Sequence, residues 1–362
     1  MVDRLKLSVV LATYNRAETL RDTLRHLADQ ELDPTCYEVI VIDDGSPDHT
    51  RKVVEEALPV VPFKMTYLHH ANRGPGYTQN RGIRLAQAPI VLLMADDILM
   101  SRQALSSHLA THQAHPEPGV AVLGQVLQSP RLTQNVFLRT WDPFRFSGFA
   151  GLTELPYYRF WACNISVKRD FVLANGLFRE PMGRAGPAAH EDPALGYQLH
   201  KAGLRILYCT EALGHHYHVV TFEQACKRRY QQGLNFGEFR TLVPEPEIPV
   251  AYHVLTWGTI GDHFRAWFGP RRQYLSAGDR NPITVVVQHL VRGLAFNRLT
   301  VRFLWNPLLA HAEHSSFLAG VVNSTMYRGT TFYHFLRGCW DGQRKFGKAW
   351  PADGLPSEAS SG

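Results

Sequence analysis

A regular alternation of apolar and amphipathic stretches over residues 1–100 limits the chain to few folds. Short apolar runs predict strands, and the stretches between them, each of about 10–15 residues with helical spacing of Leu or Val, predict helices. Strands that alternate with helices form βαβ units and a mostly parallel sheet. The expected strands are residues 5–12, 37–44, 63–70 and 89–97, and the expected helices are 16–30, 48–58 and 76–88.

Each expected strand ends in polar or glycine-rich residues. The ends are "TYN" (13–15), "DDGS" (43–46), "HHANRGPG" (69–76) and "ADD" (95–97). Right-handed crossovers bring the carboxyl ends of parallel strands to one edge of the sheet, where ligands of α/β proteins collect. The sequence therefore predicts a small-molecule site at this edge, with a solvated rim as the alternative.

Composition and charge limit the binding partners and the cellular compartment that we expect. The 362 residues carry a formal charge of +6, which favours anionic partners such as nucleotide phosphates or an acidic membrane surface. A basic stripe with interleaved aromatic residues is missing from the N-terminal part, so nucleic acid is not expected. The five Cys form no CxxC pair, and neither a signal peptide nor an apolar run of membrane-spanning length is evident. We expect a cytoplasmic protein, soluble or peripheral to a membrane.

Seven segments in order carry a family resemblance: "VVLATYNRAETL", "YEVIVIDDGSPD", "NRGPGYTQNRGIRLA", "VLLMADDILM", "CNISVKRDF", "HEDPALGYQL" and "GHHYH". Together they closely resemble glycosyltransferase family 2, over about residues 5–240. The resemblance implies a GT-A fold, Rossmann-like, with a mostly parallel sheet flanked by helices. It implies an inverting enzyme that uses a nucleotide sugar. We predict a catalytic domain at 1–240, with a nucleotide-sugar half (1–100) and an acceptor half (101–240). A helical C-terminal region (241–350) and a disordered tail (351–362) follow.

The acidic pair after the fourth expected strand resembles the metal motif of the family. The resemblance implies that Asp97 binds a divalent cation, Mn²⁺ or Mg²⁺, and that Asp96 contacts the ribose. Such cations prefer carboxylate oxygens and neutralise a departing diphosphate. Ala95 stands where many members carry a first Asp, so metal dependence rests on Asp97 in this loop. His216 or His218 would lie near the diphosphate or metal, with packed or solvated histidines as the alternative.

The other strand ends resemble the nucleotide-binding residues of the family. The resemblance places Thr13, Tyr14 and Asn15 around the nucleotide and makes Asp44 an acceptor for the imino N–H of a pyrimidine, so UDP is favoured. Asp43 is expected to cap a helix or the turn, with contact to the base as the alternative. Gly74 and Gly76 would let the backbone approach the diphosphate, Asn80 matches the family, and Arg81 would supply the charge that Gln79 lacks.

Inversion requires a carboxylate that accepts the proton of the attacking hydroxyl. The "ED" segment resembles the family motif in which Asp192 is this base, and Glu191 would orient the acceptor or support the base. An alternative role for Asp192 is to cap a helix that has Pro193 as its first residue, and the two roles are compatible. Trp161 and Asn164 are expected to line the sugar or acceptor pocket, with packing an equal alternative for Trp161.

Residues 282–322 carry apolar residues at helical spacing. They would pack on the catalytic domain, pair with a second subunit in a homo-oligomer, or lie on a membrane with Arg292, Arg298 and Arg302 near anionic lipid. The resemblance implies a hydroxyl acceptor on a glycan, a lipid-linked saccharide or a small molecule, as in polysaccharide biosynthesis at the cell envelope. The membrane would then be met at its inner face.

Two other functions stay open. Ala95 and Gln79 are consistent with a protein of the same fold that binds a nucleotide sugar but has lost its chemistry. A nucleotidyltransferase shares the α/β nucleotide-binding design. It would need a lysine-bearing glycine loop directly after the first strand, and "ATYNRAE" is not one.

Overall fold

The computed structural model describes residues 5–139, 146–180, 190–242, 290–291 and 293–346. The chain divides into two compact units. Unit 1 comprises residues 1–133, 142–182 and 191–219, and unit 2 comprises 134–141, 183–190 and 220–362. The division falls before residue 220 rather than at 240, because α7 (Phe222–Leu242) packs along α14 (Ser324–Phe346). Arg292 and the expected tail lie outside the described residues.

Unit 1 is built on one sheet of nine strands among the described residues, in the order β3-β2-β1-β4-β8-β6-β9-β5, with β7 paired to β9. Strands β3, β2, β1 and β4 are parallel, whereas β8 runs antiparallel to both β4 and β6. The strands are β1 Leu7–Thr13, β2 Tyr37–Asp43, β3 Lys64–His69, β4 Ile90–Ala95, β5 Ile98–Met100, β6 Val120–Gln128, β7 Glu154–Leu155, β8 Asn164–Lys168 and β9 Arg205–His216.

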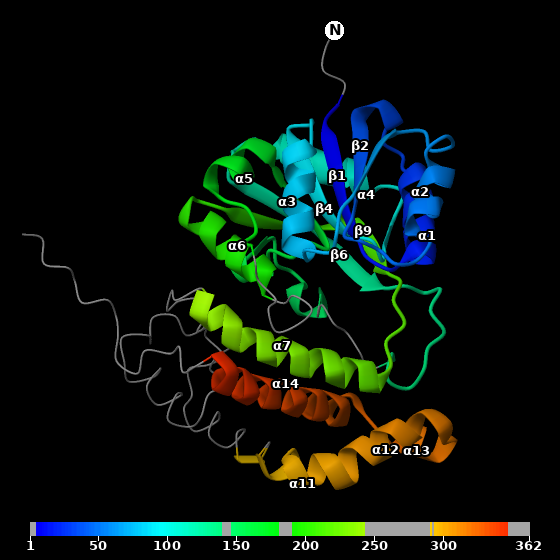
Figure 1. Cartoon of the computed structure of the whole chain (residues 1–362), viewed down its shortest axis with the longest axis vertical. Coiled ribbons are helices and arrows are strands. Elements are labelled where there is room, and N and C mark those ends of the chain that lie inside the picture. The colour runs from blue at the N-terminus through cyan, green and yellow to red at the C-terminus, as the bar shows by residue number, and fades with distance from the viewer. Residues whose placement is uncertain (1–4, 140–145, 181–189, 243–289, 292, 347–362) are drawn as a thin grey trace, which may run out of the picture. The chain divides into compact units, whose positions relative to one another are not determined.

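Helices cover this sheet and explain its apolar central strands. All seven residues of β2 are buried, as expected for a strand covered on both faces. Helix α3 packs on β1 and β2, and α4 packs on β6 and β9 (Figure 1). The helices are α1 Ala17–Ala28, α2 Thr50–Ala57, α3 Pro75–Leu85, α4 Ala104–Ala114, α5 Arg169–Asn175 and α6 Glu191–Lys201. The α/β architecture predicted from the sequence is confirmed, but the sheet is mixed rather than mostly parallel, because β5, β7 and β8 pair antiparallel with their neighbours.

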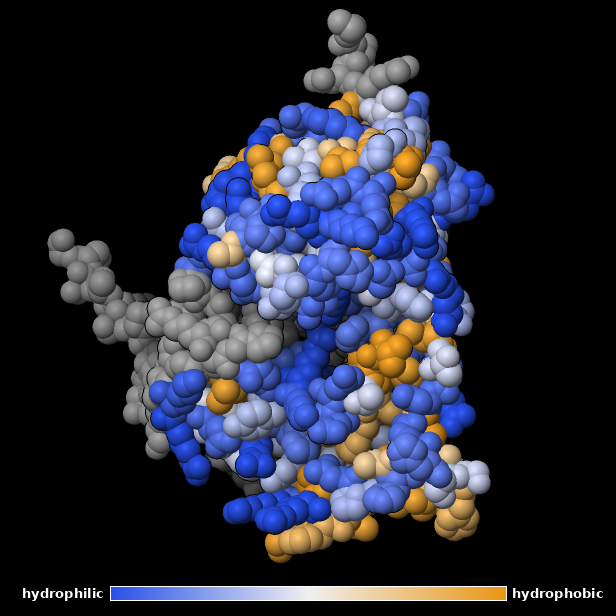
Figure 2. Space-filling view, turned by 45° about the vertical axis from the view of Figure 1, so that its right-hand side comes forward, coloured by the Kyte–Doolittle hydropathy of each residue, from blue (hydrophilic) through white to orange (hydrophobic). Residues whose placement is uncertain are grey.

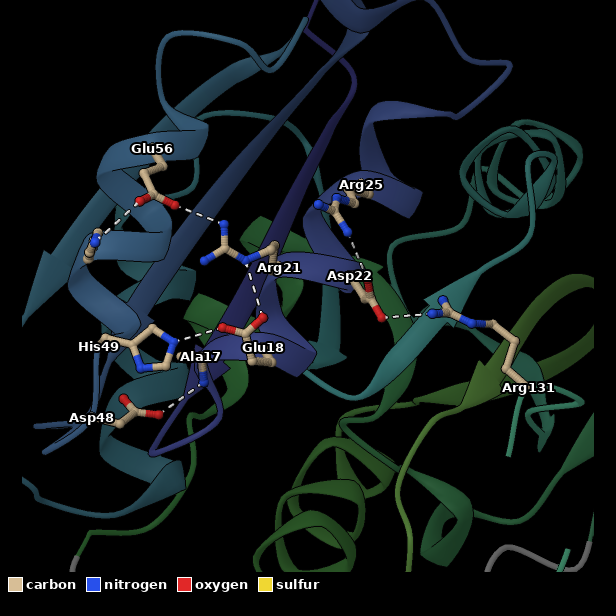
Figure 3. Close-up of polar contacts among 10 residues, drawn as sticks. Ala17, Glu18, Arg21, Asp22, Arg25, Asp48, His49, Glu56 and Arg131 are labelled. Atoms are coloured by element: carbon tan, nitrogen blue, oxygen red, sulfur yellow. Dashed lines mark hydrogen bonds and ion pairs between the residues drawn. The ribbon is translucent and has the colours of Figure 1, made fainter. Parts of the chain in front are cut away.

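Polar contacts tie α1 to α2 at the side of the sheet (Figure 3). Asp48 accepts a hydrogen bond of 3.0 Å from the backbone N–H of Ala17, the first residue of α1. Arg21 joins the same two helices through Glu56, at 2.8 Å, and also contacts Glu18 at 3.4 Å. These contacts fix the start of α1 and therefore the place of Arg16, the residue before it.

Unit 2 is helical, which confirms the expected C-terminal helical region. Helices α7 and α14 lie side by side with glycines at their contact (Figure 1). A Cβ on Gly338 would lie 2.0 Å from the carbonyl oxygen of Tyr230, and one on Gly233 would lie 2.0 Å from that of Phe335. Only glycine allows so close an approach. The shorter elements are α11 Arg298–Thr300, the π-helical turn Val301–Trp305, α12 Asn306–His311 and α13 Ser316–Val321.

Apolar side chains of unit 2 reach the surface. Leu299 and Phe303 are each 67% exposed, and Figure 2 shows hydrophobic residues gathered over the helices that Figure 1 draws in yellow and orange. Within the described ranges, the helices are too short or too polar for any of them to cross a bilayer.

Candidate functional site

The carboxyl ends of β1, β2 and β4 meet at one edge, as the sequence predicts. Thr13 pairs with Asp43 in register, and Ala12 pairs with Ala95. This register brings the "TYN", "DDGS" and "ADD" segments together although they are far apart in the sequence. Asp43 accepts hydrogen bonds from the backbone N–H of Ser46 and from the Tyr67 hydroxyl, at 2.8 Å each. Asp43 therefore caps the turn, as expected.

The Asp96–Asp97 pair occupies the turn between β4 and β5 and is buried. Thr13 donates its hydroxyl to Asp96 Oδ2 at 2.7 Å, and Thr23 donates to the Asp96 carbonyl at 2.7 Å. Arg16 Nη1 donates to Asp96 Oδ1 at 2.9 Å and also to Asp97 Oδ2. One guanidinium thus bridges both carboxylates.

The two carboxyl groups differ in acidity. Burial raises the pKa of Asp96 to about 6, against the charge of Arg16, and the neighbouring Asp97 raises it further. Burial also disfavours the Asp97 anion, but the His216 contact and the charges of His216 and Arg16 outweigh it and lower the pKa of Asp97. Asp97 is therefore the carboxylate that stays ionised, as a metal ligand must.

Both candidate histidines lie beside Asp97. Strand β9 pairs Ile98 with His216, and His216 Nε2 lies 3.5 Å from Asp97 Oδ2. The rings of His216 and His218 are 5.8 Å apart, and the backbone N–H of Tyr217 donates to the Asp97 carbonyl at 2.8 Å. Among the described residues, no three His, Cys, Asp or Glu side chains converge into a metal-binding group.

Asp192 lies in the first turn of α6, which begins one residue earlier at Glu191. The alternative that Asp192 caps this helix is therefore wrong. Its Oδ2 accepts a hydrogen bond of 3.0 Å from the backbone N–H of Ala162, a residue of another segment. The side chain is half-buried, so solvent reaches it although protein surrounds it. Burial raises the pKa of Asp192 to about 6, which the Ala162 bond partly opposes.

Residues before β8 connect Asp192 to the acidic pair. The Cys163 carbonyl accepts from the Ala95 N–H at 3.2 Å. Burial, followed by the charges of Asp192 and Asp97, raises the pKa of the Cys163 thiol. The same short segment therefore lies near both carboxylates. Glu191 is buried, and its Oε1 would lie 3.6 Å from a Cβ on Gly76, so the start of α6 also meets the start of α3.

The two expected acceptor-pocket residues both make contacts inside the protein, and the pocket role of Trp161 stays a prediction. Trp161 packs against Phe146 and Phe149, with ring centroids 5.6 and 5.8 Å away. Asn164 is fully buried, and its amide donates to the Ala212 carbonyl at 2.8 Å. Its Oδ1 lies 2.9 Å from His108 Nε2, and His108 Nδ1 lies 2.8 Å from Ser166 Oγ. Asn164 therefore lies inside a polar network in the core instead of lining a pocket.

On the nucleotide side, Asp44 organises a loop. Its two oxygens accept from the backbone N–H groups of Arg73, at 2.7 Å, and Gly74, at 3.0 Å. Gly74 has a φ of 90°, the left-handed region that favours glycine. Tyr14 is 48% exposed, and Asn15 has a φ of 54° while its N–H donates to Ser46 Oγ at 2.9 Å.

Helix α3 differs from the expectation for a diphosphate site. Asn80 is buried, and its amide pairs with the backbone of Phe178, donating to the carbonyl and accepting from the N–H at 2.9 Å each. Asn80 thus joins α3 to the segment after α5. Gly76 packs against Phe178, whose Cβ would lie 3.2 Å from an added Cβ. Buried Gln79 has an Oε1 without a hydrogen-bond partner, and Arg81 is half-buried.

The sequence interpretation missed Arg16 and Cys163. A basic residue between the first strand and the first helix was the available signal for Arg16, because this connection lies at the same edge as the acidic pair. Cys163 carried no signal, since its proximity to Asp192 and Asp97 depends on how β8 and α6 pack.

Residues 8–160 match the family described as glycosyl transferase family 2. Residues 8–160 therefore match a glycosyltransferase family 2 domain, as the resemblance implied. It is 30% identical over 234 residues to "Validoxylamine A glucosyltransferase" of Streptomyces hygroscopicus subsp. limoneus, an alignment covering 58% of this chain and 51% of that protein. It is 27% identical over 136 residues to "Poly(ribitol-phosphate) beta-N-acetylglucosaminyltransferase TarS" of Staphylococcus aureus (strain Mu50 / ATCC 700699), covering 38% and 24%. The chain thus spans about half, or less, of the length of these relatives.

A solved structure has a similar fold. It is "Mannosyltransferase PcManGT from Pyrobaculum calidifontis in complex with GDP-Man and Mn2+", with a TM-score of 0.54 and 17% sequence identity. The similarity covers 93% of this chain and 87% of that one. The expected GT-A fold is confirmed.

Proposed function

We propose that the chain is an inverting glycosyltransferase that moves a sugar from a nucleotide diphosphate sugar to a hydroxyl group. The observation that carries the proposal is Asp192, a half-buried carboxylate with its pKa raised to about 6, which the Ala162–Cys163 segment links to the acidic strand end. A general base works best when its pKa lies near the working pH. Perturbed carboxyl groups of this kind cluster at functional sites.

Asp192 acts as the base in this proposal. The acceptor oxygen forms a bond to the anomeric carbon while the bond from that carbon to the diphosphate breaks. The acceptor proton moves to Asp192, and the nucleotide diphosphate leaves with the electron pair. The Ala162 N–H holds one Asp192 oxygen in place, so the other is directed to the acceptor. Glu191, one residue away, orients the acceptor or supports the base.

The residues around Asp97 fit a divalent cation held mainly by the donor. Mg²⁺ and Mn²⁺ keep several water or phosphate ligands, so one or two carboxylates suffice. Asp97 is ionised and buried, with His216 and His218 beside it, which suits an open site better than a closed protein cage. A bound cation supplies charge neutralisation to the diphosphate leaving group. Asp96, bonded to Thr13 and Arg16, contacts the ribose.

The donor we favour is a UDP-sugar. Asp44 lies at the strand edge and is buried. Its Oδ1 accepts from Arg73 and lies 3.4 Å from His70 Nδ1, and its Oδ2 has a second lone pair beyond the one that Gly74 uses. It is therefore able to accept the imino N–H of uracil. Tyr14, Asn15 and Arg81 would complete the nucleotide contacts. Gln79 Oε1, buried without a hydrogen-bond partner, is a further group for the donor to satisfy.

The experiment is a hydrolysis and transfer screen. Wild-type protein is given UDP-, GDP- and dTDP-sugars with Mn²⁺ or with EDTA, then glycans, lipid-linked saccharides and small polyols as acceptors. We expect a UDP-sugar to be consumed, with stimulation by Mn²⁺ that Asp97→Asn loses. Binding of UDP-sugars without any turnover would instead support the catalytically altered binding protein. Release of pyrophosphate from a sugar phosphate and a nucleoside triphosphate would support the nucleotidyltransferase.

A second proposal concerns where the enzyme acts. The exposed Leu299 and Phe303 are next to Arg298 and Arg302, and apolar residues with basic neighbours are typical of helices that lie on anionic membranes. We propose contact with the inner face of a membrane, with pairing to a second subunit as the alternative. Lipid-linked acceptors would be presented there.

A further inference from the structure

Arg16 neutralises the acidic pair from within the chain. Its Nη1 donates to Asp96 Oδ1 at 2.9 Å and to Asp97 Oδ2, and its side chain is 33% exposed. Both carboxylates are buried, so their repulsion is weakly screened by water. Arg16 is therefore the cation that lets two neighbouring acids stay together at the strand end.

The oxygen that Arg16 holds is also one that a metal would need. Asp97 Oδ2 accepts from Arg16 and lies 3.5 Å from His216 Nε2, so it is shared between two basic groups. A divalent cation bound to this oxygen would lie within a few ångströms of a guanidinium that is always charged. Two cations at that distance repel each other strongly in a partly buried site.

We propose that Arg16 is a tethered cation that a divalent metal must displace from the Asp96–Asp97 pair. This inference rests on the proposed function, because it concerns the metal of that site. Competition of this kind weakens metal binding by the free enzyme. Donor phosphates supply additional metal ligands, so the metal and the donor would bind together rather than separately.

Thermal melting of the protein without donor, at pH 7.5, tests whether Mn²⁺ takes the place of Arg16 at the acidic pair. Arg16→Ala leaves a buried carboxylate pair without its cation, so in EDTA we expect its Tm to fall by roughly 6 °C or more. Millimolar Mn²⁺ should restore at least half of that loss. Wild-type protein, whose carboxylates already have a cation, should shift little with Mn²⁺ alone. Adding Asp97→Asn to Arg16→Ala should remove the Mn²⁺ effect.

Arg21→Ala is the matched control. Arg21 lies on the neighbouring helix α1 and also bridges two acids, Glu18 and Glu56, but at the surface (Figure 3). Its loss should change the Tm little, and Mn²⁺ should not matter. If Arg16→Ala does not fold, Arg16→Gln carries the same expectations, because it removes the charge and keeps most of the side-chain volume.

Direct Mn²⁺ binding, measured by electron paramagnetic resonance, gives the decisive comparison. We expect the neutral Arg16 variant to bind Mn²⁺ at least about tenfold more tightly than wild type without donor, as removal of a close like charge predicts. Equal or weaker binding, in an enzyme that Mn²⁺ still stimulates, would overturn the role of Arg16 and leave the proposed function intact. Full transfer in EDTA, with no Mn²⁺ bound by either protein, would overturn the metal site and this inference together.

Discussion

Asp97 in unit 1 and Phe303 in unit 2 are both unfavourable in a folded protein, for opposite reasons. Asp97 is a buried charge, and burying an ionised carboxylate costs several kcal/mol unless partners compensate. Phe303 is an apolar side chain left 67% exposed, where burial would have been favourable. Each unit thus keeps an arrangement that folding alone does not favour.

The two units differ in where these arrangements lie. In unit 1 the buried carboxylates Asp44, Asp96 and Asp97 gather at the ends of strands. In the described part of unit 2 the buried polar side chains are neutral, and the apolar residues are at the surface. The contrast supports the proposals that unit 1 binds a charged ligand and that unit 2 contacts another surface.

The largest expected effect is that of Asp192→Asn. Asn still accepts the Ala162 hydrogen bond but takes no proton, so transfer should fall roughly 10²–10⁴-fold. The pKa of Asp192 is higher in the folded protein than in the unfolded chain, so ionisation of this carboxyl lowers the free energy of unfolding. The loss is complete above about pH 6 and absent below the pKa of the unfolded chain. Asn should therefore raise the stability at pH 7.5 by about 1–3 kcal/mol. Kinetics and melting of the same sample measure both.

Asp170→Asn is the control for Asp192→Asn. The Asp170 side chain is 97% exposed on α5, so its replacement should change neither rate nor melting. A near-normal rate for Asp192→Asn would make Glu191 the next candidate for the base. A lower Tm without loss of rate would mean that Asp192 is structural, and unit 1 would then lose its main functional carboxylate.

The second effect is a pH dependence. With a pKa of about 6, Asp192 becomes protonated as the pH falls, so kcat/KM should drop up to about tenfold per pH unit below pH 6. Asp96 also has its pKa raised to about 6, so only the part of the drop that Asp192→Asn removes is assigned to the base. The residual rate of Asp192→Asn should lack this step. A flat wild-type profile from pH 4.5 to 8, with the protein folded throughout, would contradict the assignment.

Much of the fold was predictable because it depends on local patterns. The strands expected at 5–12 and 37–44 appear at Leu7–Thr13 and Tyr37–Asp43, since continuous apolar runs specify buried parallel strands. Leu20, Leu24 and Leu27, which have the spacing of one helix face, are buried. The boundary between the units was harder to predict, because α7 and α14 meet through glycines about 100 residues apart. No local pattern in the sequence reveals such a close contact.

The site was predictable in residue type but less so in contacts. Thr13 meets Asp96 because the ends of the parallel strands β1 and β4 converge, and His216 meets Asp97 because β9 pairs antiparallel with β5. Asn80 and Asn164 matched expected binding positions, yet each forms hydrogen bonds with buried backbone groups. Whether a buried amide binds backbone or ligand depends on packing, which the sequence does not reveal. Asp192 looked like a helix cap because Pro193 follows it, but the helix begins at Glu191 and the carboxylate instead holds Ala162.

A smaller effect is expected at Asp44. Asp44→Ala removes the acceptor for two backbone N–H groups and the proposed contact to uracil, so UDP should bind roughly tenfold more weakly. Asp44→Asn, which keeps one acceptor oxygen, should lose the preference for UDP over GDP with less loss of stability. Asp43→Asn is the control, because Asp43 caps the turn and should affect melting but not nucleotide choice. Calorimetry showing that wild type binds GDP more tightly would contradict the uracil assignment.

The smallest effect concerns the surface of unit 2. The double variant Leu299→Ser/Phe303→Ser removes two apolar side chains that are each 67% exposed, so sedimentation with anionic vesicles should show several-fold, up to roughly tenfold, weaker binding. Arg302→Gln should weaken binding about fivefold at low salt and less at high salt. Val60→Ser, 76% exposed in unit 1, should change nothing. If wild type ignores vesicles but forms a dimer that the double variant dissociates, the exposed face is a subunit contact, and the partner of unit 2 is a second copy of the chain.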